Sequence, residues 1–209
     1  MVLSGSRSSL EAVAAAARDL RPRDLPLQVA AEKPLPRLLF LTDPVRTPDP
    51  VAVAERLTPE VAVIYRAFGA PDAIETGRRL AAVAGARGLI LLAGADPQLA
   101  EAIGAHGLHL PERLAHGLAE LRAAHPGWIL TAAAHGPVGD SAADAVLVSP
   151  VFPSNSLSAG APLGVEGFSR IVEGASVPVY ALGGVTAATA PLLADTGAAG
   201  FAGIEAFLA

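Results

Sequence analysis

The chain has 209 residues, of which 52% are hydrophobic, with a formal net charge of −5 and no cysteine. The absence of cysteine excludes disulfides, thiolate nucleophiles and cysteine-bound metal clusters, and the acidic balance argues against a nucleic-acid partner because it offers no basic stripe. No apolar run reaches the roughly 18 residues of a bilayer span, and the N-terminal residues lack the apolar segment of a signal peptide, so we expect no membrane partner and a cytoplasmic location.

The first predicted element is a helix over residues 8–20, which has a serine at its start, is rich in alanine and ends before Pro22. Its apolar positions fall on one face: Leu10, Val13, Ala17 and Leu20. A proline-rich connector follows. Because this helix is too small to fold alone, we assign residues 1–36 to the same domain as the remainder, residues 37–209.

Eight short apolar runs then predict strands, at residues 37–42, 61–66, 88–93, 106–110, 128–133, 144–149, 177–182 and 199–204. Helical segments are predicted between them, at residues 49–56, 71–86, 96–104, 112–124, 165–174 and 186–196, with one turn near 137–142. This alternation predicts an α/β fold, a (β/α)8 TIM barrel with an N-terminal helical extension and a truncated last helix. We expect the helix at 8–20 to pack its apolar face near the seam between the eighth and first strands or across the barrel bottom.

An open, doubly wound parallel sheet is the alternative fold. Its usual glycine-rich turn after the first strand is missing, because Thr42, Asp43 and Pro44 stand there instead.

Ligand chemistry in a barrel lies at the C-terminal ends of the strands. Gly183 and Gly184 end the seventh predicted strand, and Gly203 and Ile204 end the eighth. Bare backbone N–H groups at such strand ends suit a phosphate, and a side chain at Gly184 would then point at the phosphate oxygens. The same glycines could instead serve only to make tight turns.

Two side chains on this face suit chemistry on an anion. His135 follows three alanines at the fifth strand exit, and imidazole is the side chain whose ordinary pKa lies nearest neutrality, so it suits proton transfer; it could instead be hydrogen-bonded to loop backbone. Arg66 offers a fork for a carboxylate or phosphate, or could pair with Asp43 or Glu112. The single lysine, Lys33, precedes the first strand, so no Schiff-base lysine is expected.

Other polar residues leave alternatives open. His109 lies within the fourth predicted strand and could be either a core group or a functional one. Asp43 and Asp96 could form a metal pair, but Asp96 precedes Pro97 and reads first as a helix N-cap, so no metal site is predicted. Glu205 would repel a phosphate at the eighth strand exit unless it turns away.

The longest rim loop, residues 150–164, is rich in serine, proline, glycine and alanine and is predicted to be a lid. Its candidate lid residues, with the serine that precedes it, are Ser149, Phe152, Ser154 and Ser156.

Six segments resemble, in order and spacing, the thiamin phosphate synthase and TenI (thiazole tautomerase) family: residues 39–43, 107–110, 134–135, 149–153, 163–167 and 181–186. The resemblance runs from about residue 38 to 207. It implies a (β/α)8 barrel that binds a thiazole phosphate, with the phosphate held by backbone at the seventh and eighth strands.

The departures from the synthase pattern bear on the reaction. The synthases carry Gln-x-Arg-x-Lys after the second strand, and here only Arg66 is present. Gly94 and Ala95 stand where the resemblance places their magnesium-holding Asn-Asp, and Leu157 replaces a lid lysine. A leaving pyrophosphate needs such cations. Pro111 and His135 instead resemble the TenI branch, which shifts a proton on a thiazole carboxylate phosphate without magnesium.

The sequence therefore favours a TenI-like tautomerase that binds a small phosphorylated thiazole, with His135 as proton shuttle, Arg66 as anion clamp and no cofactor. Two alternatives remain: a thiamin phosphate synthase with a rearranged site, which would need Mg²⁺, and a degenerate barrel that binds without catalysis. Assembly into a homo-oligomer is left open.

Overall fold

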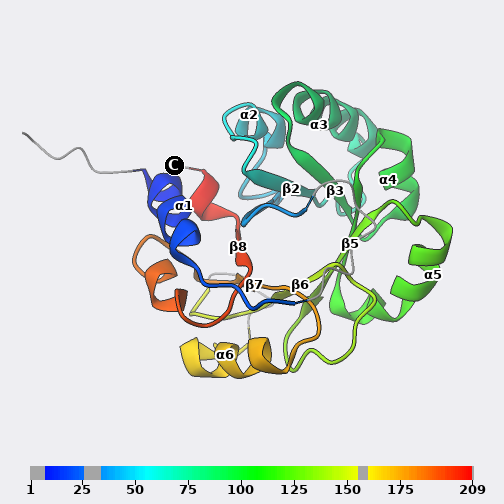
Figure 1. The fold of residues 1–209 in the computed structure, drawn as a ribbon. Helices are drawn as coiled ribbons and strands as arrows, with labels where there is room; N and C mark the ends of the chain where they lie inside the picture. Colours follow the sequence, from blue (N-terminus) through cyan, green and yellow to red (C-terminus); the bar gives the residue numbers. More distant parts are fainter. Residues whose placement is uncertain (1–7, 26–33, 155–159, 209) are drawn as a thin grey trace, which may run out of the picture.

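The computed structural model describes residues 8–25, 34–154 and 160–208. Eight parallel strands close into a barrel in sequential order, with β1 pairing with both β2 and β8 (Figure 1). The strands are β1 (Leu38–Leu41), β2 (Val61–Tyr65), β3 (Ile90–Gly94), β4 (Gly107–Leu110), β5 (Ile129–Ala134), β6 (Ala145–Val148), β7 (Val179–Leu182) and β8 (Gly200–Gly203). The predicted (β/α)8 barrel is confirmed, and the open sheet is excluded by the β1–β8 pairing.

Helices surround the barrel (Figure 1). The α-helices are α1 (Ser9–Asp19), α2 (Pro50–Ala54), α3 (Ala73–Arg87), α4 (Pro97–Ile103), α5 (Leu118–Ala124) and α6 (Gly164–Gly174), and the 3-10 helices are η1 (Glu112–Gly117), η2 (Ala190–Leu193) and η3 (Glu205–Phe207). Among the described residues, no helix is long and apolar enough to cross a bilayer.

Two helix predictions are wrong. Residues 137–142 form bends without a helical turn, and residues 186–196 contain only the short η2. In the second segment the hydroxyl groups of Thr186 and Thr189 accept hydrogen bonds from each other's backbone N–H, at 3.3 and 2.8 Å. These reciprocal bonds are those of a helix N-terminus, but Pro191 has no N–H for a continuing α-helix, and the segment goes on only as the 3-10 helix η2.

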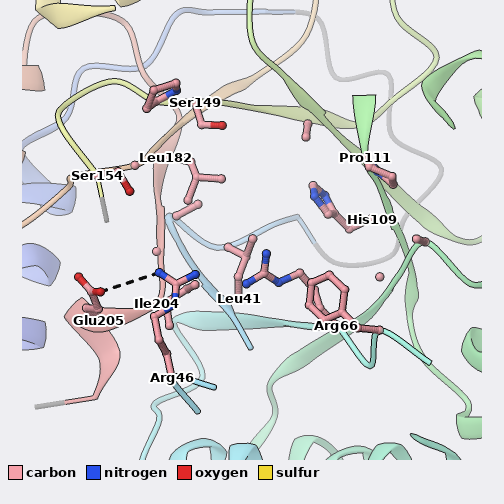
Figure 2. A pocket seen from close by; sticks show the side chains of 18 of the residues that line it. Leu41, Arg46, Arg66, His109, Pro111, Ser149, Ser154, Leu182, Ile204 and Glu205 are labelled. Carbon is pink, nitrogen blue, oxygen red and sulfur yellow. Dashed lines mark ion pairs between the residues drawn. The ribbon is translucent and has the colours of Figure 1, made fainter. Parts of the chain in front are cut away.

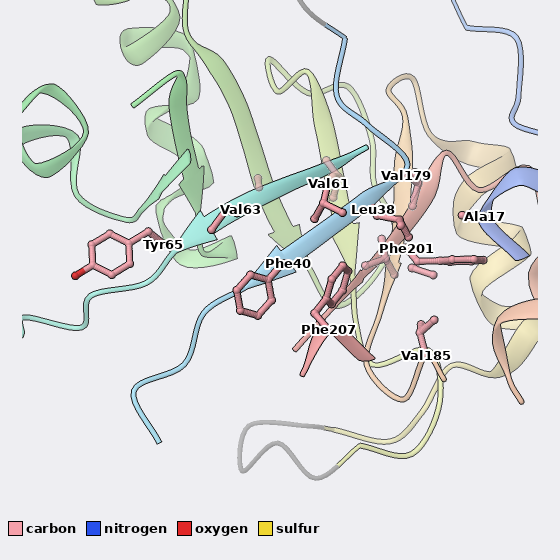
Figure 3. Packing of buried hydrophobic residues seen from close by; sticks show 14 of the residues in the cluster. Ala17, Leu38, Phe40, Val61, Val63, Tyr65, Val179, Val185, Phe201 and Phe207 are labelled. Carbon is pink, nitrogen blue, oxygen red and sulfur yellow. The ribbon is translucent and has the colours of Figure 1, made fainter. Parts of the chain in front are cut away.

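Alternation along each strand divides the core into two layers. In β1, Leu39 and Leu41 pack inside the barrel, whereas Leu38 and Phe40 belong to the layer between the strands and the helices. In that outer layer Phe40 meets Phe207 of η3, with 5.5 Å between ring centroids (Figure 3). The inner layer ends below the C-terminal rim and so forms the floor of the cavity described next.

Helix α1 packs against β8, η2 and η3, beside the C-terminal segment (Figure 1). It begins with a capping box between Ser8 and Glu11, and its buried residues join the outer core layer: Val13, Ala16, Ala17 and, just beyond the helix, Leu20. Arg37, at the start of β1, donates to the carbonyl of Ala17 at 2.7 Å. The helix therefore lies over the β8–β1 seam, as the sequence led us to expect.

Candidate functional site

A cavity of about 620 Å³ opens at the C-terminal ends of the strands. Its volume is in the range of small-molecule sites. Residues from the inner faces of four strands, and the residue that follows β8, form its floor: Leu41, His109, Leu182, Ala202 and Ile204. The loops that follow the strands make its walls, so residues far apart in sequence meet around one space.

Arg66 follows β2 and lines this cavity (Figure 2). Its backbone N–H and Nε donate to the Oγ1 and carbonyl of Thr42 at 2.9 and 2.6 Å, and Nη2 lies 3.5 Å from Oδ2 of Asp43. The guanidinium also lies 5.3 Å from the ring centroid of Phe68. Burial lowers the pKa of Arg66, whereas the charge of Asp43 raises it. The ion pair between Arg66 and Asp43 that the sequence analysis considered therefore forms, and Arg66 lines the cavity as well.

Asp43 is a fixed anion in the β1 loop. Its Oδ1 accepts from the backbone N–H groups of Val45 and Arg46 at 3.1 and 3.0 Å, and its Oδ2 accepts from Nη2 of Arg46 at 3.1 Å. Burial acts to raise the pKa of Asp43, but these hydrogen bonds and the charge of Arg46 together lower it to about 2. Its oxygens are thus already engaged by hydrogen-bond donors.

Asp96, the other carboxylate weighed as a metal ligand, caps α4 by accepting from the N–H of Leu99 at 2.9 Å. No group of three or more His, Cys, Asp or Glu side chains converges as a metal set within residues 8–25, 34–154 and 160–208.

Arg46 is a site residue that the sequence analysis missed. It lines the cavity from the β1 loop, and its Nη1 lies 3.8 Å from Oε1 of Glu205 at the start of η3 (Figure 2). Together with the Asp43 contact, this pair connects the exits of β1 and β8. The repulsion expected from Glu205 is therefore partly offset by a cation that no motif marked, because only barrel closure brings the two residues together.

His135 follows β5 and pairs with Glu112 at the start of η1. Nδ1 of His135 lies 2.8 Å from Oε2 of Glu112, and the backbone N–H of His135 donates to Oε1 at 3.2 Å. The two side chains are 49% and 51% exposed, and of the two only His135 lines the cavity. The hydrogen bonds from His135 lower the pKa of Glu112. The imidazole thus binds a carboxylate, not the loop backbone, and Glu112 pairs with His135, not Arg66.

His109 is a different kind of histidine. Its side chain is buried, projects toward the cavity and has Nδ1 2.9 Å from Oγ1 of Thr131 (Figure 2). Burial, with a smaller contribution from the charge of Arg66, lowers the pKa of His109 to about 4. His109 is therefore neutral near pH 7 and can offer a ligand a hydrogen bond but not a positive charge.

All four residues predicted to bind phosphate line the cavity: Gly183, Gly184, Gly203 and Ile204. The expectation that a side chain at Gly184 would point at a phosphate is wrong. A Cβ on Gly184, whose φ is +68°, would lie 2.5 Å from the carbonyl oxygen of Pro153 and 2.6 Å from Cβ of Phe152. At Gly203 a Cβ would meet only a ring atom of Phe207 at 3.7 Å, an ordinary contact.

The glycine pair thus seats the base of the predicted lid. The N–H groups of Val151 and Phe152 donate to the carbonyls of Leu182 and Gly183, both at 3.0 Å. Ser149 and Ser154 line the cavity, whereas Phe152 packs partly buried against the outer core layer. Ser156 and Leu157 lie outside the described residues.

Comparisons of the sequence with known proteins point to one family. A family model described as thiamine monophosphate synthase matches residues 38–207. The thiamine-phosphate synthase of Archaeoglobus fulgidus is 34% identical over 139 residues, which cover 65% of this chain and 66% of that protein. The thiamine-phosphate synthase of Corynebacterium efficiens is 44% identical over 66 residues, 31% of each chain. The chain spans just under two thirds of the length of three of the curated relatives that it matches.

Among solved structures, thiamine phosphate pyrophosphorylase from Pyrococcus furiosus superposes with a TM-score of 0.67 and 24% identity, covering 80% of this chain and 85% of that one. An HpcH/HpaI aldolase from Desulfitobacterium hafniense superposes with a TM-score of 0.57 and 17% identity, over 81% and 86% of the two chains. At these identities the likeness shows the barrel fold alone.

Proposed function

The chain belongs to the thiamine monophosphate synthase family, and within it we propose that this protein is a TenI-like thiazole tautomerase, a cytoplasmic enzyme that binds a small phosphorylated thiazole and moves a proton on it. One observation supports the proposal: His135, with its Nδ1 2.8 Å from a Glu112 carboxylate, lines the cavity at the C-terminal ends of the strands. A positioned imidazole is the group best suited to give and take a proton near pH 7.

In the proposed proton transfer His135 and Glu112 have different roles. In the proposal Glu112 accepts a hydrogen bond from the N–H at Nδ1 and thereby fixes the ring orientation, so Nε2 is the nitrogen that exchanges a proton with the ligand. When Nε2 takes a proton from the thiazole, the ring becomes an imidazolium beside a carboxylate whose lowered pKa keeps it ionised. The imidazolium then returns a proton to a different atom of the same substrate, so no bond between heavy atoms breaks. Glu112 is a positioning residue in this scheme.

The two anionic ends of a thiazole carboxylate phosphate find partners on opposite sides of the cavity. In the proposal the phosphate binds at the β7 and β8 exits, beside Gly183, Gly184, Gly203 and Ile204, and Arg66 receives the carboxylate. Arg66 is held by Thr42 and keeps a 3.5 Å contact with Asp43, so its guanidinium is oriented before a ligand arrives.

A synthase with a rearranged site is the second candidate, and the names of the sequence relatives favour it. That reaction needs Mg²⁺, which proteins usually hold through one or two carboxylates together with substrate phosphates. The described residues do not fit this need. Gly94 and Ala95 line the cavity where the family resemblance places magnesium ligands, Asp43 is engaged by Arg46, and Asp96 caps a helix.

The test is an isomerisation assay with thiazole carboxylate phosphate in the presence of a chelator. Replacing His135 with Asn should lower kcat by roughly 10² to 10⁴ and leave KM nearly unchanged, because general acid–base groups contribute about that much and the anion contacts lie elsewhere. His116, which is exposed on η1 and does not line the cavity, offers the matched control: His116→Asn should retain wild-type kcat. Glu112→Gln should lower kcat less and alter its pH profile. Wild-type turnover by His135→Asn would refute the proposal.

A further inference from the structure

We propose that Arg46 binds the ligand's phosphate and that Glu205 is an internal counter-ion, which occupies Arg46 in the empty site and is displaced when the phosphate arrives. This inference rests on the proposed phosphorylated ligand and adds a residue outside the motifs that carry the family resemblance. It also explains why a carboxylate is tolerated at the β8 exit, beside Gly203 and Ile204.

The two contacts of Arg46 differ in strength. Nη2 is hydrogen-bonded to Oδ2 of Asp43 at 3.1 Å, and that carboxylate is fixed by the N–H groups of Val45 and Arg46. Nη1 lies 3.8 Å from Oε1 of Glu205, which is an ion-pair distance but too long for a hydrogen bond. One side of the guanidinium is therefore anchored, and the other side is engaged loosely enough to change partner.

The exposure of the three side chains also indicates that Glu205, not Asp43, is the partner that Arg46 can release. The side chain of Arg46 is 29% exposed and that of Asp43 is 18% exposed, whereas that of Glu205 is 61% exposed. Glu205 can rotate into water without losing a buried environment, while Arg46 stays in the cavity wall. Figure 2 shows the Arg46 guanidinium next to Ile204, at the strand end where the phosphate is proposed to lie.

The charges around this end of the cavity favour an exchange of anions. Arg46 and Arg66 carry two positive charges, and Asp43 and Glu205 carry two negative ones, so this cluster is balanced when no ligand is bound. If Glu205 turns away, the cluster gains a net positive charge, which a phosphate can neutralise with charge-assisted hydrogen bonds to Nη1. The site should therefore select a phosphorylated thiazole over the corresponding alcohol.

Calorimetry with thiazole phosphate, and with inorganic phosphate as a smaller probe, tests the inference through a double-mutant cycle. Removing the guanidinium in Arg46→Gln should weaken binding by about tenfold or more, and removing the competing charge in Glu205→Gln should tighten it by roughly 3- to 10-fold. In the Arg46→Gln background, Glu205→Gln should change affinity by less than about twofold, because Glu205 then has no partner to occupy.

A second ion pair provides the control. Arg21 and Asp195 are in contact at 2.8 Å, both are exposed, and neither lines the cavity. Arg21→Gln and Asp195→Asn make the same changes in net charge and should leave both affinities unchanged. If Arg46→Gln fails to fold, Arg46→Lys keeps the charge beside Asp43 but loses the fork, and it should bind several-fold more weakly than wild type.

The outcomes separate this inference from the proposed function. If wild type binds thiazole phosphate and neither Arg46 variant binds it more weakly, the inference is overturned and the proposed ligand stands. A Glu205→Gln gain that persists without Arg46 means direct repulsion of the ligand, and it also overturns the exchange. If no variant binds either probe and wild type does not isomerise the thiazole, both are overturned.

Discussion

Gly184→Ala tests whether the base of the predicted lid, at Phe152 and Pro153, packs directly on Gly184. At this position an added Cβ meets two obstacles, a backbone φ of +68° and contacts of 2.5 and 2.6 Å with Pro153 and Phe152. The left-handed backbone costs an L-residue roughly 1–2 kcal/mol, and forcing a methyl group into a packed region costs about 1–3 kcal/mol more. We therefore expect a loss of roughly 2–5 kcal/mol in the free energy of unfolding.

Two other glycines separate these contributions. Gly104 also has a positive φ, +65°, but nothing lies within 4 Å of an added Cβ, so Gly104→Ala should lose only about 1–2 kcal/mol. Gly85 lies within α3 with the same open space, and Gly85→Ala should gain roughly 0.5–1 kcal/mol.

Urea unfolding followed by circular dichroism measures all three, and calorimetry with thiazole phosphate adds a functional readout. Because Gly184→Ala must displace residues 152 and 153, it should also weaken ligand binding, whereas Gly104→Ala should not. The reasoning is refuted if Gly184→Ala is no less stable than Gly104→Ala.

Two further predictions concern stability. Leu20, which directly follows α1, is buried, so Leu20→Ala should cost roughly 2–5 kcal/mol by urea unfolding. Leu192 is exposed, so Leu192→Ala should change stability by less than about 0.5 kcal/mol, and equal effects would contradict the role of α1 and its C-cap in covering the seam. The pKa of Asp43 is lowered from 3.8 to about 2 on folding, so its contribution to stability is present above about pH 4 and is lost as the pH falls through about 2. Wild type should therefore exceed Asp43→Asn in stability near neutral pH and approach it near pH 2, and a constant difference would count against this linkage.

Much of the fold could be predicted from local pattern. The apolar run at residues 37–42 became β1 at Leu38–Leu41, and the other predicted strands agree with the observed ones to within about two residues, because buried parallel strands are continuous apolar segments between turn residues. The α-helix predicted at 186–196 is wrong although Thr186 and Thr189 make the bonds of a helix N-terminus, because Pro191 cannot supply the N–H that a longer α-helix needs.

The position of the site could be predicted from the barrel topology more than from the chemistry of its side chains. Strand ends meet at one rim in any such barrel, so His135, Arg66 and the four phosphate-site residues could be expected around one cavity, and all of them line it. Their roles as proton shuttle, clamp and phosphate cradle stay predictions.

Pairings across the rim could not be predicted in the same way. Arg46 meets Glu205 only because β1 pairs with β8, and Glu112 meets His135 because η1 follows the neighbouring strand. The low pKa of His109 depends on the burial of its side chain in the folded barrel. Such features depend on side-chain positions after closure, which no local spacing encodes.

The central claim is metal-independent proton transfer on a phosphorylated thiazole. The most direct measurement is NMR of thiazole carboxylate phosphate incubated with the wild-type protein in deuterated water and a chelator. The account predicts isomerisation with deuterium incorporated at the carbon that receives the proton, because the shuttled proton exchanges with solvent. No isomerisation under these conditions, together with Mg²⁺-dependent release of pyrophosphate when a pyrimidine pyrophosphate is supplied, would contradict it.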